Sequence, residues 1–219
     1  MTNQQTRLKI CGITNLEDAR FAAGAMADYL GFIFYPGSAR HVSPRTAAEI
    51  SGWIEGPGKV GVFVNQPIEE VNSVIDRVGI DMVQLHGDES VDYARKVKKP
   101  VIKVFRVKGS ENAADLEKTL ENWKGVAAYF LFDAFDKKEF GGTGKTWDWS
   151  LMKCITCDTP FFLAGGISSD NVKNAVALLR PYAVDLSSTL EDRPGVKDFE
   201  KMQDFFDQWN EIRDVQNES

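Results

Sequence analysis

The chain has 219 residues, 43% of them hydrophobic, and a formal net charge of −6. This length suits one domain with a large core or two small domains. The acidic balance argues against a nucleic-acid-binding protein, because such proteins usually carry a basic surface. No apolar run approaches the ~20 residues of a membrane span, and the polar residues 1–7 do not form a secretory signal. The three cysteines cannot all pair, which favours a reducing, cytoplasmic compartment.

Short apolar segments alternate along the chain with segments of helical pattern. Strands are predicted at 8–11, 29–34, 59–64, 82–85, 101–105, 129–132, 161–164 and 183–186. Helices are predicted at 16–25, 44–53, 90–98, 113–123, 149–153 and 198–212, with one more after 65–67 that ends near 78 and one capped by Ser168 or Ser169 that ends near 179. Thr14 or Asn15 caps the first helix, and Pro44 suits the first position of the second. Residues 214–219 are predicted to be a frayed polar tail.

This alternation gives eight strand–helix units. Strands separated by helices pair in parallel through right-handed crossovers. Eight such units in a chain of this length predict a single-domain (β/α)8 barrel over residues 1–219. A doubly wound open sheet is the alternative. It would usually show a dominant glycine-rich turn after the first strand, and the turn at Gly12 does not contain G-x-G-x-x-G.

The end of the first strand combines a cation and a thiol. Side chains alternate along a strand, so Lys9 and Cys11 share one face while Leu8 and Ile10 share the other. A thiol beside an ammonium loses its proton more easily, and the thiolate is the reactive form. Cys11 therefore has two interpretations, a reactive thiolate or one more small buried hydrophobe.

Active sites of such barrels lie at the C-terminal ends of the strands. A half-buried carboxylic acid at Asp133 tends to stay protonated, because burial disfavours its charged form. Asp133 and Cys11 therefore form a candidate acid–base pair, although Asp133 is alternatively a helix cap or a partner of Lys9. The residues at or just beyond the strand ends are Cys11, Arg40, Asn65, His86, Arg106, Asp133, Gly165, Gly166, Asp185, Ser187 and Ser188.

Two small-residue turns at these ends predict a phosphate site. The glycines of 165–166 let the backbone approach a ligand, and the N–H groups that open the following helix point at an anion. The serines of 187–188 follow the eighth strand, where barrels often place the other half of such a site. Two ordinary tight turns are the alternative. Arg40 can hold a carboxylate through its two-pronged guanidinium, although a lone arginine is more often a surface residue.

Two other motifs suggest cofactors but lack the required context. The segment 141–146 is not a P-loop, because Glu139 stands where the motif needs a glycine. It is either a flexible loop that closes over the site or a plain surface loop. Cys154 and Cys157 form a C-x-x-C without a second pair for zinc, and they precede a strand rather than follow one, unlike a thioredoxin-like motif. A structural or incidental role is expected for them.

Taken together, the motifs resemble the N-(5'-phosphoribosyl)anthranilate isomerase family of tryptophan biosynthesis. They occur in order over nearly the whole chain, and although each is weak alone, jointly they are highly specific. The matching stretches are 9–14 (KICGIT), 31–36 (GFIFYP), 61–65 (GVFVN), 83–87 (VQLHG), 141–149 (GGTGKTWDW), 163–167 (LAGGI), 184–188 (VDLSS) and 194–198 (PGVKD).

The resemblance implies an Amadori rearrangement, in which the aminoaldose phosphoribosylanthranilate becomes an aminoketose. Asp133 is then the general acid, which protonates the furanose ring oxygen and opens the ring to a Schiff base. Cys11 is the general base, which removes the proton from sugar C2. Arg40 would face the anthranilate carboxylate, and Asp185 the sugar hydroxyls. The other implied substrate-binding residues are Gly165, Gly166, Ser187 and Ser188 for the phosphate, together with His86 and Lys9.

The resemblance also implies a phosphosugar–anthranilate substrate and no metal or organic cofactor. From the charge, the apolar runs and the cysteines we expect no nucleic-acid or membrane partner and a cytoplasmic location, and we expect a monomer or homodimer. The chain departs from the family at Thr189, where a glycine is usual. Because threonine lacks the conformational freedom of glycine, this departure is expected to affect phosphate affinity rather than the reaction. A non-catalytic phosphosugar-binding barrel, or a redox barrel that uses Cys154 and Cys157, is the competing interpretation. An analogous enzyme of histidine biosynthesis resembles this fold but has an aspartate in place of Cys11.

Overall fold

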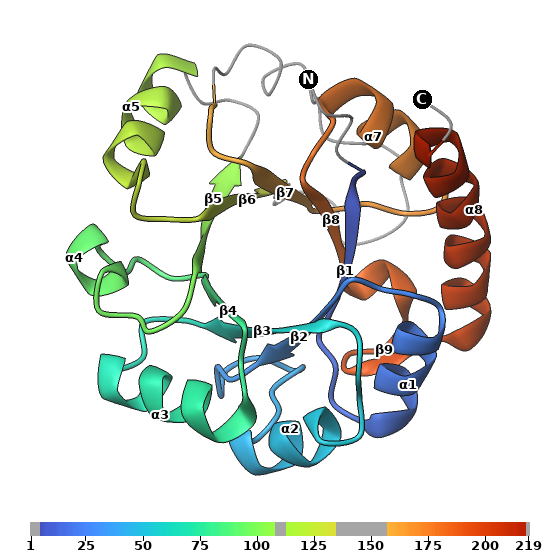
Figure 1. Cartoon of the computed structure of the whole chain (residues 1–219), viewed down its shortest axis with the longest axis horizontal. Coiled ribbons are helices and arrows are strands. Elements are labelled where there is room, and N and C mark those ends of the chain that lie inside the picture. Colours follow the sequence, from blue (N-terminus) through green and yellow to red (C-terminus); the bar gives the residue numbers. More distant parts are fainter. Residues whose placement is uncertain (1–4, 108–112, 135–156, 218–219) are drawn as a thin grey trace.

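The computed structural model of the chain describes residues 5–107, 113–134 and 157–217. At its centre, eight parallel strands close into a barrel in sequence order (Figure 1). Each strand overlaps its predicted range, and the predicted (β/α)8 fold is confirmed. The strands are β1 (Arg7–Cys11), β2 (Tyr29–Ile33), β3 (Gly58–Phe63), β4 (Met82–Leu85), β5 (Val101–Val107), β6 (Tyr129–Ala134), β7 (Phe161–Ala164) and β8 (Ala183–Leu186).

Helices form a ring outside the strands, and α8 closes this ring between α7 and α1 (Figure 1). The predicted loop at 141–146, the predicted helix at 149–153 and Cys154 fall outside the described residues. In the part of the chain that the structure describes, no helix is long and apolar enough to cross a membrane. The helices are α1 (Leu16–Gly24), α2 (Pro44–Ser51), α3 (Ile68–Val78), α4 (Val91–Ala94), α5 (Ala113–Trp123), α7 (Val172–Leu179) and α8 (Phe199–Asn217).

Two helices begin where the sequence provides a capping side chain. The Asn15 side chain accepts a hydrogen bond from the Asp18 N–H at the start of α1. The Ser43 side chain accepts one from the Thr46 N–H at the start of α2, and Pro44 takes the first helical position as predicted. These oxygens satisfy donors that a first helical turn leaves free. Of the two predicted caps of the first helix, Asn15 is therefore the one that the structure uses.

Side-chain alternation along the strands separates an outer from an inner layer. Leu8 and Ile10 are fully buried in the larger apolar cluster, between the barrel and the helices. Val60 and Phe162 belong to a smaller cluster inside the barrel. Cys11 faces the inner side and lines the cavity at the strand ends. The predicted split of β1 into an apolar outer face and a functional inner face is thus confirmed.

The helix predicted at 90–98 is wrong in length, because α4 ends at Ala94. Its start is capped by Ser90, whose side chain accepts a hydrogen bond from the Tyr93 N–H. Beyond the helix, the Val97 N–H bonds the Ala94 carbonyl. This spacing of three residues belongs to a tight turn rather than to an α-helix, and a polar surface pattern does not distinguish the two.

The frayed tail predicted at 214–219 is also wrong as far as the structure describes it, because α8 continues to Asn217. The side chain of Gln216 holds this end of the helix. Its Oε1 accepts a hydrogen bond from the Thr6 N–H at 3.1 Å, and its Nε2 donates to Thr6 Oγ1 at 3.4 Å. The partner lies 210 residues away in the sequence, so no local pattern signals it.

The segment between β8 and α8 forms structure that the sequence did not predict. A short 3-10 helix, η1 (Ser188–Leu190), leads into an antiparallel pair, β9 (Glu191–Arg193) and β10 (Val196–Lys197). Its turn contacts the first βα loop, where the Thr14 hydroxyl donates to the Gly195 carbonyl. The pair therefore brings β10 against the C-terminal end of β1.

Candidate active site

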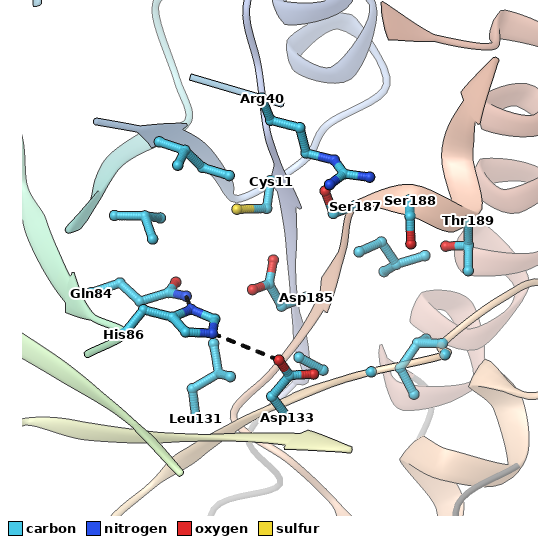
Figure 2. Close-up of a pocket in the computed structure, with 17 residues that line it drawn as sticks. Cys11, Arg40, Gln84, His86, Leu131, Asp133, Asp185, Ser187, Ser188 and Thr189 are labelled. Atoms are coloured by element: carbon cyan, nitrogen blue, oxygen red, sulfur yellow. Dashed lines mark hydrogen bonds and ion pairs between the residues drawn. The ribbon is translucent and has the colours of Figure 1, made fainter. Parts of the chain in front are cut away.

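The C-terminal ends of the strands enclose a cavity of ≈ 260 Å³. His86 and Asp133 lie on one side of it, Arg40 and Ser187 on the opposite side, and Asp185 between them (Figure 2). Of the residues predicted at the site, Lys9 and the strand-end candidates Asn65 and Arg106 do not line this cavity. Those that line it are Cys11, Arg40, His86, Asp133, Gly165, Gly166, Asp185, Ser187 and Ser188.

Lys9, which was predicted to bind substrate, does not reach the cavity surface. Its side chain is fully buried, and its ammonium donates to Asp185 Oδ2 at 2.7 Å. Burial alone lowers the pKa of Lys9, but the charge of Asp185, the charge of Cys11 and the hydrogen bond to Asp185 together outweigh burial and leave the pKa raised. The alternative that Asp133 pairs with Lys9 is not the one in the structure, since the Lys9 ammonium pairs with Asp185 instead. Lys9 therefore orients a cavity residue from below rather than facing a ligand.

The Cys11 thiol is held in a buried position at the end of β1, with 6% of the residue exposed. Burial raises its pKa and Asp185 adds to that increase, while the charges of Lys9 and Lys197 act in the opposite direction. The expected effect of Lys9 on the thiol is present, since its charge lowers the pKa of Cys11, but burial is the larger effect and leaves the pKa raised. An apolar site raises the pKa of a thiol, and one buried cation does not offset that effect here.

Gly31 provides the room that the thiol occupies. This residue is the partner of Cys11 in the β1–β2 pairing. A Cβ atom at Gly31 would lie 2.7 Å from Cys11 Sγ and 3.0 Å from Cys11 Cα. The neighbouring strand therefore needs a residue without a side chain at this position.

We expect Gly31→Ala to lower kcat strongly and to change the urea midpoint of unfolding only slightly. The added methyl group must push Cys11 away, and a small displacement of a reacting group can cost about 100-fold in rate. The comparison of kcat with the urea midpoint of unfolding tests this expectation. Gly52→Ala is the matched control, because a Cβ there would meet no atom closer than 3.5 Å. An unchanged kcat in Gly31→Ala would contradict the role given to this position.

Asp133 is the last residue but one of β6, and it lines the cavity. Burial raises its pKa, and the charge of Asp185 adds to this, while Arg106 and Lys9 oppose it. The predicted upward direction is confirmed. Asp133 Oδ2 lies 3.8 Å from His86 Nε2. Asp133 thus faces a histidine on the same side of the cavity rather than a lysine.

Arg40 is held by a protein carboxylate. Its Nε donates to Glu191 Oε1 at 2.8 Å, and its Nη2 donates to Glu191 Oε2 at 2.7 Å. Burial alone raises the pKa of Glu191, but the hydrogen bonds from Arg40 and the charge of Lys197 hold it below its ordinary value. A guanidinium has five N–H donors, so the Nη1 edge of Arg40 is left for a ligand after Glu191 has taken the Nε edge. Arg40 is therefore a fixed cation in the cavity wall and not a free surface residue.

Lys197 connects this ion pair to the rest of the site. Its fully buried ammonium donates to Glu191 Oε1 at 3.2 Å, to the Cys11 carbonyl at 2.7 Å and to the Ser187 carbonyl at 3.1 Å. One side chain of β10 thereby fixes the ends of β1 and β8 relative to the carboxylate that holds Arg40. The sequence analysis assigned no role to Glu191 or Lys197, and a charged residue beyond the last strand gives no local signal that it is buried.

The predicted phosphate turns meet at one side of the cavity. Gly165 and Gly166 both have positive φ angles, 82° and 68°, a conformation that favours glycine. The turn is fixed by Asn171, whose Nδ2 donates to the Gly166 carbonyl at 2.7 Å. Asn171 is also the residue before α7, so the cap predicted at 168 or 169 is wrong. On the facing turn, the Ser187 hydroxyl is buried without a hydrogen-bond partner in the described structure.

These features place a carboxyl group, a thiol and small-residue turns around one cavity at the C-terminal ends of the strands, where (β/α)8-barrel enzymes carry their active sites. Within residues 5–107, 113–134 and 157–217, no group of three or more His, Cys, Asp or Glu side chains is placed to hold a metal ion. The predicted lack of a cofactor remains a prediction.

Comparison with known proteins identifies the class more closely. A family model for N-(5'-phosphoribosyl)anthranilate (PRA) isomerase matches residues 8–208. The N-(5'-phosphoribosyl)anthranilate isomerase of Geotalea uraniireducens is 45% identical over 201 residues, which cover 91% of this chain and 96% of that relative. The Aquifex aeolicus protein of the same name is 43% identical over 203 residues, with the same two coverages of 91% and 96%.

Solved structures give the same answer. The crystal structure of phosphoribosyl anthranilate isomerase from Thermotoga maritima matches with a TM-score of 0.83 at 38% identity, over 94% of this chain and 100% of that one. Another phosphoribosyl anthranilate isomerase, solved in complex with reduced 1-(o-carboxyphenylamino)-1-deoxyribulose 5-phosphate, matches with a TM-score of 0.80 at 36% identity over the same shares. The chain therefore belongs to the N-(5'-phosphoribosyl)anthranilate isomerase family, and the predicted family is confirmed.

Proposed function

We propose that the chain converts N-(5'-phosphoribosyl)anthranilate to 1-(2-carboxyphenylamino)-1-deoxyribulose 5-phosphate in tryptophan biosynthesis, with Asp133 as general acid and Cys11 as general base. The observation that carries this assignment is that the acid and the thiol open onto one cavity, with Asp185 between them (Figure 2). An aldose–ketose rearrangement needs one group that gives a proton and another that takes one.

The proposed steps balance in protons and bonds. Asp133 gives its proton to the furanose ring oxygen while the C1–O bond breaks and the anthranilate nitrogen forms a protonated Schiff base with C1. The Cys11 thiolate then takes the proton from C2, which leaves an enolamine. The enolamine becomes the aminoketose when its hydroxyl loses a proton and C1 gains one. Solvent returns a proton to Asp133 and accepts the one on Cys11.

The remaining cavity residues fit the other groups of this substrate. The free edge of Arg40 would take the anthranilate carboxylate, which matches a guanidinium fork. Asp185 Oδ1 is buried without a partner in the described structure, while Oδ2 is held by Lys9, so Oδ1 is available to a sugar hydroxyl. The turns at 165–166 and 187–188 would take the phosphate.

A fluorescence assay tests the proposed function. Freshly made phosphoribosylanthranilate is supplied to the purified protein with a chelator, and the anthranilate signal is followed. We expect the signal to decay faster than the spontaneous background. A folded protein that gives no acceleration would reject the isomerase assignment and favour a non-catalytic phosphosugar-binding barrel.

Thr189, where the family usually has glycine, fits the phosphate side of the cavity. Its backbone is not among the described non-glycine residues with positive φ, so it needs no glycine-like conformation. Its hydroxyl oxygen is buried and has no hydrogen-bond partner in the described structure, and the residue lines the cavity. The substitution therefore adds a potential phosphate ligand instead of weakening the turn through backbone strain.

We expect Thr189→Val to raise KM about tenfold with little change in kcat. A hydrogen bond to a charged group contributes about 1.5 kcal/mol or more, which is roughly this factor. Thr189→Ser is the matched control and should retain the KM of the parent. Competitive inhibition by inorganic phosphate should weaken in parallel with the substrate in Thr189→Val. If KM and phosphate inhibition both stay unchanged, the hydroxyl is not a phosphate ligand.

A further inference from the structure

We propose that Gln84 is a positioning residue for the acid: its amide fixes the tautomer of His86, so that His86 presents its Nε2–H to Asp133. The inference rests on the proposed function for its consequence in catalysis, but the tautomer itself can be measured without any substrate. Sequence analysis placed His86 at the site and gave no role to Gln84.

The geometry begins with a buried amide in the cavity wall. Gln84 on β4 is 2% exposed and lines the cavity. Its Nε2 lies 3.2 Å from His86 Nδ1, and its Oε1 is buried without a partner in the described structure. Figure 2 shows the amide nitrogen turned toward the imidazole and the amide oxygen turned away from it. An amide nitrogen only donates hydrogen bonds, so Nδ1 of His86 must accept.

His86 stays neutral in this environment. Burial lowers its pKa to about 4, and the charges of Arg106 and Lys9 act in the same direction. Lys103 also lowers the pKa, and Glu89 alone among the stated contributors raises it. A neutral imidazole has one donor and one acceptor nitrogen. Because Nδ1 accepts from Gln84, Nε2 carries the proton.

That proton faces the acid. His86 Nε2 lies 3.8 Å from Asp133 Oδ2, a separation that shortens readily when a ligand orders the site. A donor on this side favours the carboxylate that remains once Asp133 has given its proton away. It also leaves Oδ1 as the oxygen that carries the proton toward the substrate. The other charged groups that act on Asp133 are Arg106 and Lys9, which lower its pKa, and Asp185, which raises it.

Gln84→Glu should reverse the arrangement. A carboxylate at position 84 can only accept a hydrogen bond, so it draws the imidazole proton to Nδ1 and leaves a lone pair on Nε2 facing Asp133. Gln84→Met removes the amide at similar volume and adds no charge. It should leave the imidazole without an anchor on Nδ1.

The tautomer is read directly by long-range 1H–15N NMR of the imidazole nitrogens. The chain contains two histidines, so the exposed His41 is identified and removed by His41→Gln. We expect the parent protein to carry its His86 proton on Nε2 at neutral pH, and Gln84→Glu to carry it on Nδ1. A parent spectrum with the proton on Nδ1, or with equal signals in both proteins, overturns the proposal whether or not the protein is an isomerase.

The catalytic consequence is measured on Gln84→Met. Loss of a partner that orients a functional histidine typically costs roughly tenfold or more, so we expect kcat to fall about tenfold while KM changes little. Because a donor to the carboxylate is weakened, the pKa of Asp133 rises. The acidic limb of the rate profile, which Asp133 governs since carboxyls ionise below thiols, should therefore move to higher pH.

Gln66→Met is the matched control. Gln66 lies on the loop between β3 and α3, and its side-chain amide donates to the Phe34 carbonyl and to Glu70 instead of to a cavity residue. A merely structural role of Gln84 would lower kcat without moving the acidic limb, and that outcome would overturn the positioning role. If the parent shows no turnover but the tautomers are as expected, the arrangement stands and the proposed reaction fails. The two hypotheses are thus separated.

Discussion

Asp133→Asn is expected to lower kcat by roughly 10²–10⁴-fold, the usual contribution of one general acid. An amide cannot deliver a proton to the ring oxygen, so ring opening loses its assistance. The substitution is nearly isosteric, and Asp133 makes no hydrogen bond within the described residues that the fold would lose. Its Oδ2 lies 3.8 Å from His86 Nε2. We therefore expect the free energy of unfolding to change little.

Binding separates a catalytic effect from a damaged cavity. The reduced aminoketose phosphate that occupies a solved relative is a suitable probe, because it already has the open-chain form. Its Kd should be nearly the same for Asp133→Asn and for the parent protein, measured by quenching of anthranilate fluorescence. A variant that binds this probe normally and turns over at the parental rate would show that another group is the acid.

Cys11→Ser is the second large effect, and we again expect a loss of roughly 10²–10⁴-fold in kcat. A serine hydroxyl ionises far above a thiol, so it cannot remove the proton from C2. The side chain keeps nearly its size, which matters because Gly31 leaves little spare room. Turnover at the parental rate would reject Cys11 as the base.

Two further cysteine variants sharpen this test. Cys157→Ser is the matched control, since Cys157 lies away from the cavity, and its thiol donates to the Thr159 carbonyl at 3.2 Å. Cys157→Ser should keep full activity. If the protein were a redox barrel that uses Cys157, this variant would lose activity. Cys11→Asp replaces one base with another and should recover part of the activity lost in Cys11→Ser. A carboxylate ionises at lower pH than a thiol, so the recovered activity should extend to lower pH.

The pH dependence follows from the directions of the two pKa shifts. Burial raises the pKa of both Asp133 and Cys11, and because carboxyls and thiols ordinarily ionise about five units apart, Asp133 loses its proton first. Between the two pKa values the pair holds one proton, and the reactive form, with that proton on Asp133 and not on Cys11, is a constant fraction. We therefore expect kcat/KM to rise through the lower pKa and to fall above the higher one.

The single variants should break this bell in opposite directions. Asp133→Asn still needs the thiolate, so its residual activity rises continuously with pH. Cys11→Ser still needs the carboxylic acid, so its residual activity falls continuously with pH. Profiles of kcat/KM for the three proteins test both signs, and a bell retained in either variant would show that the missing limb belongs to another group.

The barrel could be predicted from the sequence because the position of each strand is visible in the local pattern of residues. Each is a short apolar run, and in a parallel barrel all their ends meet at one mouth, so Cys11 and Asp133 were placed together without any structure. What could not be predicted depends on partners distant in sequence. Arg40 pairs with Glu191, 151 residues away. Lys9 pairs with Asp185 rather than with Asp133, because β8 and not β6 is the neighbour of β1.

Burial was the other quantity that the sequence did not provide. Local pattern indicated that Lys9 would assist ionisation of the thiol, but the depth of the site reverses the net direction. In the sequence, Gln84 is one polar residue in a motif. The structure shows that its amide nitrogen contacts His86 Nδ1 and that its amide oxygen is buried without a partner among the described residues. In both cases the deciding factor is the removal of water, which a linear pattern does not measure.

The hydrogen bond from Lys197 to the Cys11 carbonyl bears on how the enzyme is made. The ribosome delivers Cys11 at the beginning of synthesis and Lys197 near the end, 186 residues later. Contacts between such distant residues form late, because a long loop must close before they are gained. A nascent chain that lacks its last residues therefore has neither the Lys197 hydrogen bond at Cys11 nor the Glu191 carboxylate that holds Arg40. The barrel also closes only when β8 pairs with β1, so the fold and the site are both completed by the last part of the chain to be made.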